Sequence, residues 1–271
     1  MELNNKVALV TGAASGIGRG IALALARRGC DLALLDVNAD GLAATGKETE
    51  ALGVKVATYI QDVSDLNSLR SLPNRVFSDF PAVDILVNNA GIAVGGEFLQ
   101  VEEADFDKLL TINFHAKVLL TRLFLPHLQE RPRAQVVYIS SLFGLISPPG
   151  HTAYSASKFA LRGFANSLRF ELMGSNVKVC VVHPGGVSTD IARNAKPPIG
   201  VSEEEIRDAR EEMQKFLRMP AEKAGEIIVR GMKREKARIL VGWDAKLLAR
   251  IERWFPVGYW KILNTFRKEK S

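Results

Sequence analysis

Seven short apolar runs, rich in valine, isoleucine and leucine, alternate along this 271-residue chain with segments of helical periodicity. The runs are continuously apolar, as expected for strands that are buried on both faces of a parallel sheet. They cover residues 6–11, 31–36, 54–60, 84–88, 135–140, 177–183 and 238–241. This alternation predicts an α/β fold, a doubly wound, seven-stranded parallel sheet in a single domain.

The composition is that of a globular protein, with 47% hydrophobic residues. Cys30 and Cys180 each lie in an apolar run, which argues against a disulfide scaffold and favours a reducing, cytoplasmic setting. No zinc-like spacing joins them to the four histidines, so we expect no metal. We see no signal peptide at the start and no apolar run near the roughly 18 residues that a membrane-spanning helix needs.

The positive charge is concentrated near the end of the sequence. Residues 243–271 hold seven basic and three acidic side chains and so contribute +4 of the net +6. The rest of the chain is nearly neutral, which argues against nucleic acid as a partner.

A glycine-rich stretch, TGAASGIG at residues 11–18, joins the first predicted strand to the first predicted helix. Gly12, Gly16 and Gly18 lack the Cβ atoms that would keep a pyrophosphate away from the backbone. The helix behind them begins with free N–H groups and a partial positive charge, which favour an anion. Because the glycines lie inside a strand–helix–strand unit, they predict a dinucleotide site rather than an ordinary turn.

Asp36 closes the second strand, at the distance from the glycines where a carboxylate binds both hydroxyls of a ribose. It could instead cap the following helix. A carboxylate here repels a 2′-phosphate, and Ser15 offers no charge to attract one, so NAD is preferred over NADP. Arg19 is the residue that could reverse this preference by turning toward the phosphate.

The segment YSASK places Tyr154 and Lys158 four residues apart, on one face of a helix. Ser141 follows the fifth strand, at the edge where such sheets bind ligands, and Asn113 lies in the helix after the fourth strand. Hydride leaves an alcohol carbon only as the O–H proton is removed, so a base must contact that oxygen. A nearby ammonium favours a phenolate and lowers the tyrosine pKa from about 10. We therefore predict an oxidoreductase with Tyr154 as its general acid/base.

Taken together, these motifs resemble those of the short-chain dehydrogenase/reductase family, from about residue 5 to about residue 242. The matching pieces are TGAASGIG, Asp36, DV at 62–63, NNAG at 88–91, Asn113, Ser141, YSASK and PGGVST at 184–189. The resemblance implies a Rossmann fold with strand order 3-2-1-4-5-6-7. It also implies interconversion of a secondary alcohol and a ketone, or of an alcohol and an aldehyde.

The resemblance assigns a role to each candidate residue. Asp62 and Val63 would meet the adenine, Asn89, Ala90 and Gly91 the ribose, and Val187 and Thr189 the nicotinamide carboxamide. The catalytic set is Asn113, Ser141, Tyr154 and Lys158, with Asn113 holding a water that relays a proton from Lys158. The candidate cofactor contacts are Gly12, Ser15, Gly16, Ile17, Gly18, Asp36, Asp62, Val63, Asn89, Ala90, Gly91, Tyr154, Lys158, Pro184, Gly185, Val187 and Thr189.

Two other functions stay open from the residues alone. One is an NADPH-dependent carbonyl reductase, and the other is a non-catalytic dinucleotide-binding redox sensor or scaffold. The intact set of Ser141, Tyr154 and Lys158 argues against the second. The histidines have no paired ligands, and among them only His151 is placed to line a substrate pocket.

Segments outside the motifs suggest how substrate and partners bind. Residues 190–236 are helical and charged and are a candidate substrate lid. A homodimer or homotetramer is expected through helices near 113–129 and 152–173, with Leu161, Phe164, Leu168 and Leu172 forming an apolar stripe.

Residues 243–271 form an amphipathic, basic and aromatic extension with a stripe of Leu247, Leu248, Ile251 and Trp254. This extension could cover the substrate mouth, bind a partner subunit or contact an anionic membrane surface. Each reading fits a lipophilic substrate.

Overall fold

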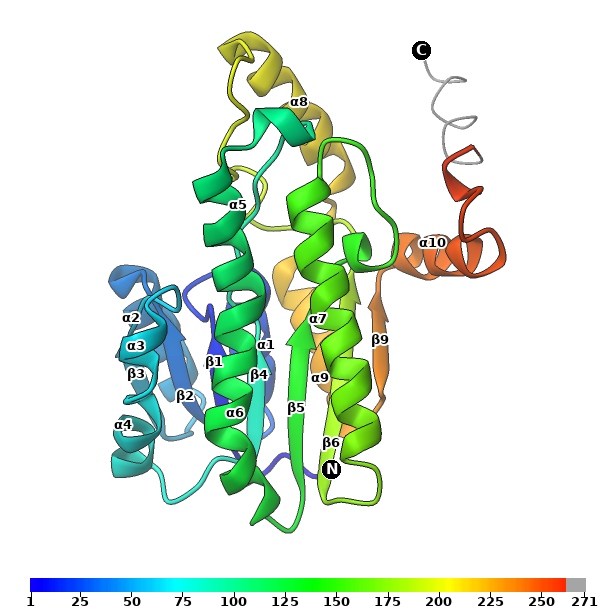
Figure 1. Ribbon diagram of the computed structural model, residues 1–271. Helices are drawn as coiled ribbons and strands as arrows, with labels where there is room; N and C mark the ends of the chain where they lie inside the picture. Colours follow the sequence, from blue (N-terminus) through cyan, green and yellow to red (C-terminus); the bar gives the residue numbers. More distant parts are fainter. Residues whose placement is uncertain (262–271) are drawn as a thin grey trace.

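The computed structural model describes residues 1–261 and contains a seven-stranded, all-parallel sheet (Figure 1). Its strand order is β3-β2-β1-β4-β5-β6-β9, so the predicted order is confirmed, with β9 as the seventh strand. The strands are β1 (Val7–Thr11), β2 (Asp31–Asp36), β3 (Val56–Ile60), β4 (Ile85–Asn88), β5 (Ala134–Ile139), β6 (Val177–Pro184) and β9 (Arg238–Val241). Each predicted run forms a strand, and in the central strands β1, β4, β5 and β6 the valine and isoleucine side chains suit a pleated surface that is buried on both sides.

Helices cover both faces of the sheet. One face packs against α1 (Gly16–Ala26), α2 (Ala39–Glu50) and α9 (Ala221–Lys233). The other packs against α3 (Leu66–Leu69), α4 (Leu72–Asp79), α6 (Ala116–Gln129) and α7 (Thr152–Glu171). This arrangement confirms the doubly wound α/β fold and leaves the carboxyl ends of the strands free at one edge.

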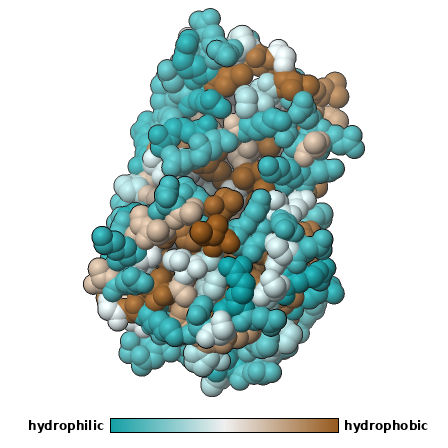
Figure 2. Space-filling view, turned by 90° about the vertical axis from the view of Figure 1, so that its left-hand side faces the viewer, coloured by the Kyte–Doolittle hydropathy of each residue, from teal (hydrophilic) through white to brown (hydrophobic). Residues whose placement is uncertain are grey.

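Above that edge lie the segments that surround the site (Figure 1). They are the short helix η1 (Phe98–Gln100), α5 (Glu103–Leu110), the π-helical turn η2 (Thr111–His115), η3 (Leu142–Gly144) and α8 (Glu203–Phe216). Two short strands, β7 (Val187–Ser188) and β8 (Met219–Pro220), pair with each other in parallel. Figure 2 turns the β3 side of the molecule toward the viewer and shows apolar groups near the top, at the level of η1 and α8.

The segment predicted as a lid divides into two parts. Ile228, Val229 and Met232 of α9 are fully buried in the core that α9 shares with α1. This helix is therefore the crossover that leads to β9 and does not cover the site. Helix α8 has no buried residue and projects beyond the sheet, so the lid stays a prediction for residues 190–218 alone.

The stripe predicted to form a subunit interface packs inside the subunit instead. Leu161, Leu168 and Leu172 are at most 8% exposed and, with Phe164, pack against the sheet's own core. The prediction is wrong for Leu161, Leu168 and Leu172, because an apolar helical stripe also serves to bind a helix to its own sheet, whereas Phe164 is only partly buried. The outer face of α7 carries Phe159 and Phe170, which are 36% and 68% exposed.

The last described helix, α10 (Trp243–Trp254), begins directly after β9. Its buried residues are Ala245 and Ala249, whereas Leu247 and Trp254 of the predicted stripe are 44% and 78% exposed. Leu247 and Trp254 therefore do not pack on this subunit, and their contact with a partner subunit or a membrane surface stays a prediction. Within residues 1–261 no helix is long and apolar enough to cross a membrane.

Candidate active site

The glycine loop between β1 and α1 turns as the sequence predicts. Gly12 and Gly16 have φ values of +66° and +54°, which residues with a Cβ rarely adopt. A Cβ on Gly18 would lie 1.9 Å from the carbonyl oxygen of Gly12, so only glycine permits this turn. The Ser15 side chain accepts no capping hydrogen bond, and the first N–H groups of α1 are left for a ligand. Ile17 follows in the first turn and packs against the core.

The carboxylate of Asp36 lies beside this loop. It accepts one hydrogen bond from the Ala14 N–H and one from the Asn38 N–H, each 2.9 Å long. It does not cap α2, because the capping acceptor there is the side chain of Asn38. The carboxylate is thereby held at the end of β2, where the sequence predicts it.

The cation that could reverse the cofactor preference is engaged by acids. Arg19 forms ion pairs with Glu48 and Glu222. Val37, directly after Asp36, is 64% exposed and apolar. The end of β2 thus offers a carboxylate and an apolar surface, as a ribose and an adenine require.

Asp62 and Val63 follow β3. The Asp62 carboxylate accepts the N–H of Ser64 at 2.7 Å and is exposed. The side chain of Val63 is only 8% exposed and packs in the core, so Val63 would meet an adenine through its backbone.

The segment Asn89, Ala90 and Gly91 is tied to the glycine loop by Thr11. The Thr11 hydroxyl accepts the N–H groups of Asn89 and Ala90 at 2.9 and 3.0 Å and donates to the Val87 carbonyl at 3.2 Å. The Asn89 side-chain amide donates to the carbonyls of Thr11 and Gly12. Sequence reasoning missed this role, although Thr11 opens the TGAASGIG motif.

Asn113 lies in the π-helical turn η2 and is completely buried. Its side-chain oxygen accepts the Ile92 N–H at 2.9 Å, and its amide donates to the Ile92 carbonyl at 3.0 Å and to Ser157 Oγ at 3.1 Å. Both amide hydrogens are therefore engaged, so the side chain can bind a relay water only through its oxygen, which accepts one hydrogen bond here. A Cβ on Gly91 would come within 2.9 Å of the Asn113 oxygen, which explains the glycine there.

Ser141 lies two residues after the end of β5, as the N-cap of η3, and is fixed from two sides. Its Oγ accepts the Phe143 N–H at 3.1 Å, and its carbonyl lies 2.9 Å from Nδ1 of His183. Because a carbonyl only accepts, Nδ1 must carry a hydrogen. Burial lowers the pKa of His183 to about 4, so this histidine is neutral and acts as a support for Ser141. The sequence predicts a structural role for His183 without locating its partner.

Tyr154 and Lys158 lie one turn apart on α7, with the Lys158 Nζ 5.2 Å from the centre of the Tyr154 ring. Burial raises the pKa of Tyr154 to about 12, and a hydrogen bond with Ser141 acts in the opposite direction. Burial lowers the pKa of Lys158 to about 8, and its ammonium donates to the Ile139 carbonyl at 3.3 Å. The sequence argument therefore underestimates burial, which opposes phenolate formation at this site.

A second buried lysine lies behind the first. Lys117 of α6 is 1% exposed, and its Nζ is 3.5 Å from the same Ile139 carbonyl. Burial, and next to it the charge of Lys158, lower the pKa of Lys117 well below its ordinary value. Sequence reasoning did not find this residue, because a lone lysine in a helical segment usually lies on the surface.

The remaining predicted contacts follow β6. A Cβ on Gly16 would lie 3.2 Å from Thr189 Cγ2, so Thr189 closes the glycine loop from the far side. Val187 is 4% exposed and packs in the core, which leaves its backbone for a ligand. Pro184 ends β6, and a Cβ on Gly185 would collide with the carboxylate of Asp244.

Asp244 is a further positioning residue that the sequence did not indicate. Its carboxylate accepts the Gly186 N–H at 2.6 Å, so the first turn of α10 holds the loop after β6. The boundary predicted after Gly242, between the catalytic domain and the C-terminal extension, therefore does not separate two packing units, because α10 packs on the loop that follows β6.

Comparison with known proteins places this geometry in a family. The model of the short chain dehydrogenase family matches residues 6–199. The SadH protein of Mycobacterium tuberculosis is 41% identical over 264 residues, which cover 97% of this chain and 95% of the relative. A 3-oxoacyl-[acyl-carrier-protein] reductase, FabG, of Thermotoga maritima is 33% identical over 70% of this chain and 77% of its own length.

A solved structure of a short-chain dehydrogenase/reductase has a similar fold. A short chain dehydrogenase/reductase from Burkholderia phymatum, in complex with NAD, superimposes with a TM-score of 0.86 at 26% identity, covering 94% of this chain and 95% of that one. The chain belongs to the short-chain dehydrogenase/reductase family, and it is an oxidoreductase with a nucleotide-binding Rossmann fold.

Proposed function

We propose that this protein is an NAD(H)-dependent alcohol dehydrogenase or carbonyl reductase, with Tyr154 as its general acid/base. The observation that carries the proposal is the placement of Tyr154 beside Ser141 and Lys158, above the glycine loop and Asp36. A bound nicotinamide supplies the acceptor or donor of a hydride. The protein supplies the binding site, the proton and the orientation of the substrate.

The reaction follows from the surroundings of the tyrosine. In the oxidising direction, the Tyr154 oxygen takes the hydroxyl proton of the alcohol while the carbinol carbon loses a hydride, and a carbonyl compound forms. Ser141 Oγ binds the substrate oxygen and keeps it within reach of Tyr154. Lys158 stabilises the phenolate. The proton that Tyr154 takes up leaves by way of Lys158 and a water held at the η2 turn, and passes to solvent.

Burial alone holds Tyr154 protonated, so the phenolate requires nearby positive charge. Lys158 is one source, and its pKa of about 8 leaves it mostly charged at neutral pH. Oxidised nicotinamide, when bound, is the other. We expect alcohol oxidation to become faster as the pH rises, until Lys158 loses its proton.

Asp36 supports NAD over NADP. Its carboxylate is held at the end of β2 by two backbone hydrogen bonds, and Arg19 is paired with acids elsewhere. A 2′-phosphate would approach this carboxylate with no cation to neutralise it. We propose a preference for NAD of at least about tenfold in kcat/KM, since a repulsion near 1.4 kcal/mol suffices for that ratio.

A lipophilic substrate fits the rim of the site. Phe98 and Leu99 of η1 are 63% and 86% exposed, and the Gln100 carbonyl of the same helix accepts the N–H of Ile199 in the predicted lid. His151 lies against Phe143, with ring centres 4.9 Å apart, and lines the approach to Tyr154.

The C-terminal extension reaches the loop in front of the catalytic helix. The Ser147 N–H donates to the Tyr259 hydroxyl at 3.0 Å, and the Trp260 indole N–H donates to the Ser147 carbonyl at 2.9 Å. We propose that this contact orders the substrate loop. We expect a dimer or tetramer that uses the outer faces of α6 and α7.

The test is a panel of secondary alcohols and ketones, each assayed with both nicotinamides. Tyr154→Phe is expected to abolish turnover and leave NAD binding nearly intact, since only the oxygen that carries the proton is removed. Asp36→Ala is expected to lower the ratio of kcat/KM with NAD to kcat/KM with NADP. Retention by Tyr154→Phe of more than about 1% of turnover would contradict the acid/base assignment. Equal wild-type kinetics with both cofactors would contradict the role of Asp36.

A further inference from the structure

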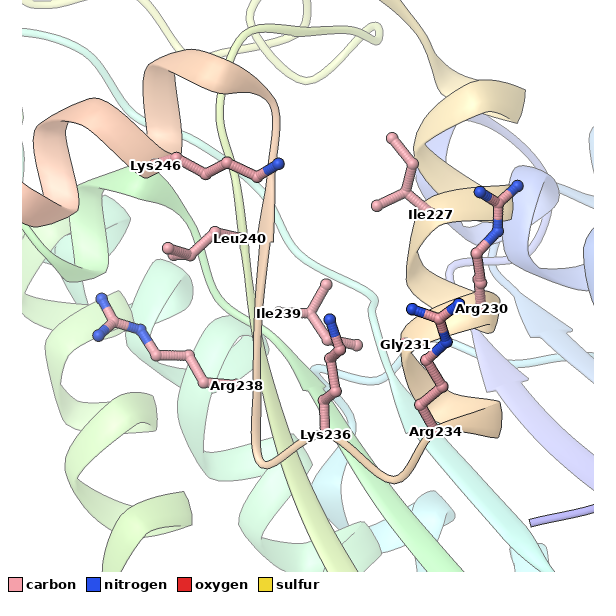
Figure 3. A pocket seen from close by; sticks show the side chains of 9 residues that line it. All are labelled: Ile227, Arg230, Gly231, Arg234, Lys236, Arg238, Ile239, Leu240 and Lys246. Carbon is pink, nitrogen blue, oxygen red and sulfur yellow. The ribbon is translucent and has the colours of Figure 1, made fainter.

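A basic groove lies at the free edge of the sheet, away from the catalytic residues (Figure 3). It occupies about 310 Å³ between α9, β9 and the first turn of α10. The lining residues are Ile227, Arg230, Gly231, Arg234, Lys236, Arg238, Ile239, Leu240 and Lys246. The lining thus combines five cations with apolar side chains and contains no carboxylate.

The side chains from three elements surround the same space. Figure 3 shows Arg230 on α9, Arg234 directly after its end, Lys236 beside the start of β9, and Lys246 extending from α10. Arg238 points to the other side of β9. There, burial lowers its pKa, the charges of Arg162 and Arg253 act in the same direction, and Glu252 opposes them.

The acidic residues nearest in sequence are engaged elsewhere. Glu226 pairs with Arg27 and Arg28, and Glu235 pairs with Arg133 and the N-terminal amine. Within residues 1–261, none of the five groove cations has a carboxylate partner within 4 Å. A cation near the end of α9 is favoured by the helix dipole. That effect explains Arg230 and Arg234 but not Lys236 or Lys246.

An exposed apolar ridge borders the groove. Trp243, Leu247 and Trp254 lie on the outer side of α10 and are 76%, 44% and 78% exposed. Their spacing of four and seven residues places them on one helical face. Lys246 and Arg253 flank this face, and Lys246 also lines the groove, so the first turn of α10 belongs to both the ridge and the groove. Indoles and basic side chains are the pair that favours the interface between lipid and water.

Two other occupants fit this surface less well. A second copy of the chain, paired along β9, would bring two sets of five cations together. A nucleic acid would match the cations but would leave the ridge of Trp243, Leu247 and Trp254 in water.

We propose that the groove and the α10 ridge form a docking surface for an anionic phospholipid bilayer. Headgroup phosphates bind among Arg230, Arg234, Lys236 and Lys246, and the exposed indoles enter the boundary between headgroups and acyl chains. The surface holds the enzyme on the membrane by one edge of its sheet and leaves the carboxyl ends of the strands open.

The experiment is co-sedimentation of the full-length protein with vesicles of phosphatidylcholine, with and without a quarter phosphatidylglycerol. Binding is expected only to the anionic vesicles and is expected to weaken as salt is added. All three tryptophans of the chain lie in or just after α10, so their emission should shift to the blue on binding.

The decisive variant is R230Q/R234Q/K236Q, which removes three groove cations. It is expected to weaken partitioning about a hundredfold, from the effect of each cation near an anionic surface. The matched control, K47Q/R70Q/K108Q, removes three exposed cations from other parts of the molecule and should change binding by less than threefold. Thermal unfolding of both variants should match the wild type, because all six side chains are exposed.

Several outcomes would overturn the proposal. If both variants lose vesicle binding equally, net charge and not the groove explains the binding. If the protein binds neutral vesicles equally well, apolar contact explains it. Inorganic phosphate that displaces the protein from vesicles at millimolar concentration would leave a simple anion site. Tighter binding to duplex DNA than to anionic vesicles would make the surface a nucleic-acid site.

Discussion

Lys158→Met is expected to make the folded protein more stable while it abolishes catalysis. Lys158 is 2% exposed, and burial lowers its pKa from 10.5 to about 8. Methionine has a similar length and fills the same space without a charge. The substitution therefore removes the cost of burying an ammonium group and removes the cation that Tyr154 needs.

The magnitude follows from the displacement of the pKa. A difference of about 2.5 units corresponds to roughly 3 kcal/mol of folding free energy. Because the folded pKa is the lower one, the unfolded chain binds more protons between pH 8 and 10.5, and wild-type stability rises with pH across that window. The cost of the lysine is fully present below pH 8 and disappears above 10.5. Loss of the hydrogen bond to Ile139 offsets about 1 kcal/mol at every pH.

Denaturant unfolding of both proteins at about pH 7 and pH 9.5 measures this effect. The variant should be about 2 kcal/mol more stable at pH 7, and its advantage should fall by about 2 kcal/mol at pH 9.5. Lys108→Met, at an exposed position on α5, is the control and should show no such dependence. If the advantage of Lys158→Met does not change with pH, the buried ammonium is not the cause and the reasoning fails.

Two further substitutions test the supports of the site. Thr11→Val removes the acceptor of two backbone N–H groups, so unfolding should require about 2 kcal/mol less and NAD should bind more weakly in calorimetry; unchanged NAD affinity would show that the loop is held in some other way. Lys117→Met should also stabilise the fold near neutral pH in denaturant unfolding, because burial and the charge of Lys158 both disfavour the Lys117 ammonium. A loss of stability would show that the contact of Lys117 with the Ile139 carbonyl outweighs the cost of burying it.

The sheet and the order of its strands were predictable because each strand is a short apolar run, and the central strands β1, β4, β5 and β6 are buried almost throughout. The candidate site was predictable because its residues follow those strands directly. Asp36 ends β2, and Ser141 follows β5. Parallel strands bring such positions to one edge, whatever lies between them in the sequence.

Which face of a helix packs on the core was not predictable from the sequence for α7 and α10. The stripe of Leu161 and Leu168 on α7 has the spacing of an apolar face, and that spacing is the same for a core and for a subunit interface. On α10 the small residues Ala245 and Ala249 are buried, and the larger Trp243 and Trp254 are exposed. Side-chain size and hydropathy alone would predict the opposite, with the tryptophans buried and the alanines exposed.

The roles of Lys117 and Asp244 were not predictable from the sequence, and for the same reason. Each is a charged residue whose role depends on one backbone group far away in the chain, the Ile139 carbonyl for Lys117 and the Gly186 N–H for Asp244. A pattern of neighbouring residues does not contain such a contact. Both contacts nevertheless bear on the site, because Ile139 also receives Lys158 and Gly186 lies in the loop proposed to bind nicotinamide. The catalytic side chains are therefore held by groups that only the fold brings near them, and burial of two lysines on one carbonyl is the stability cost of that arrangement.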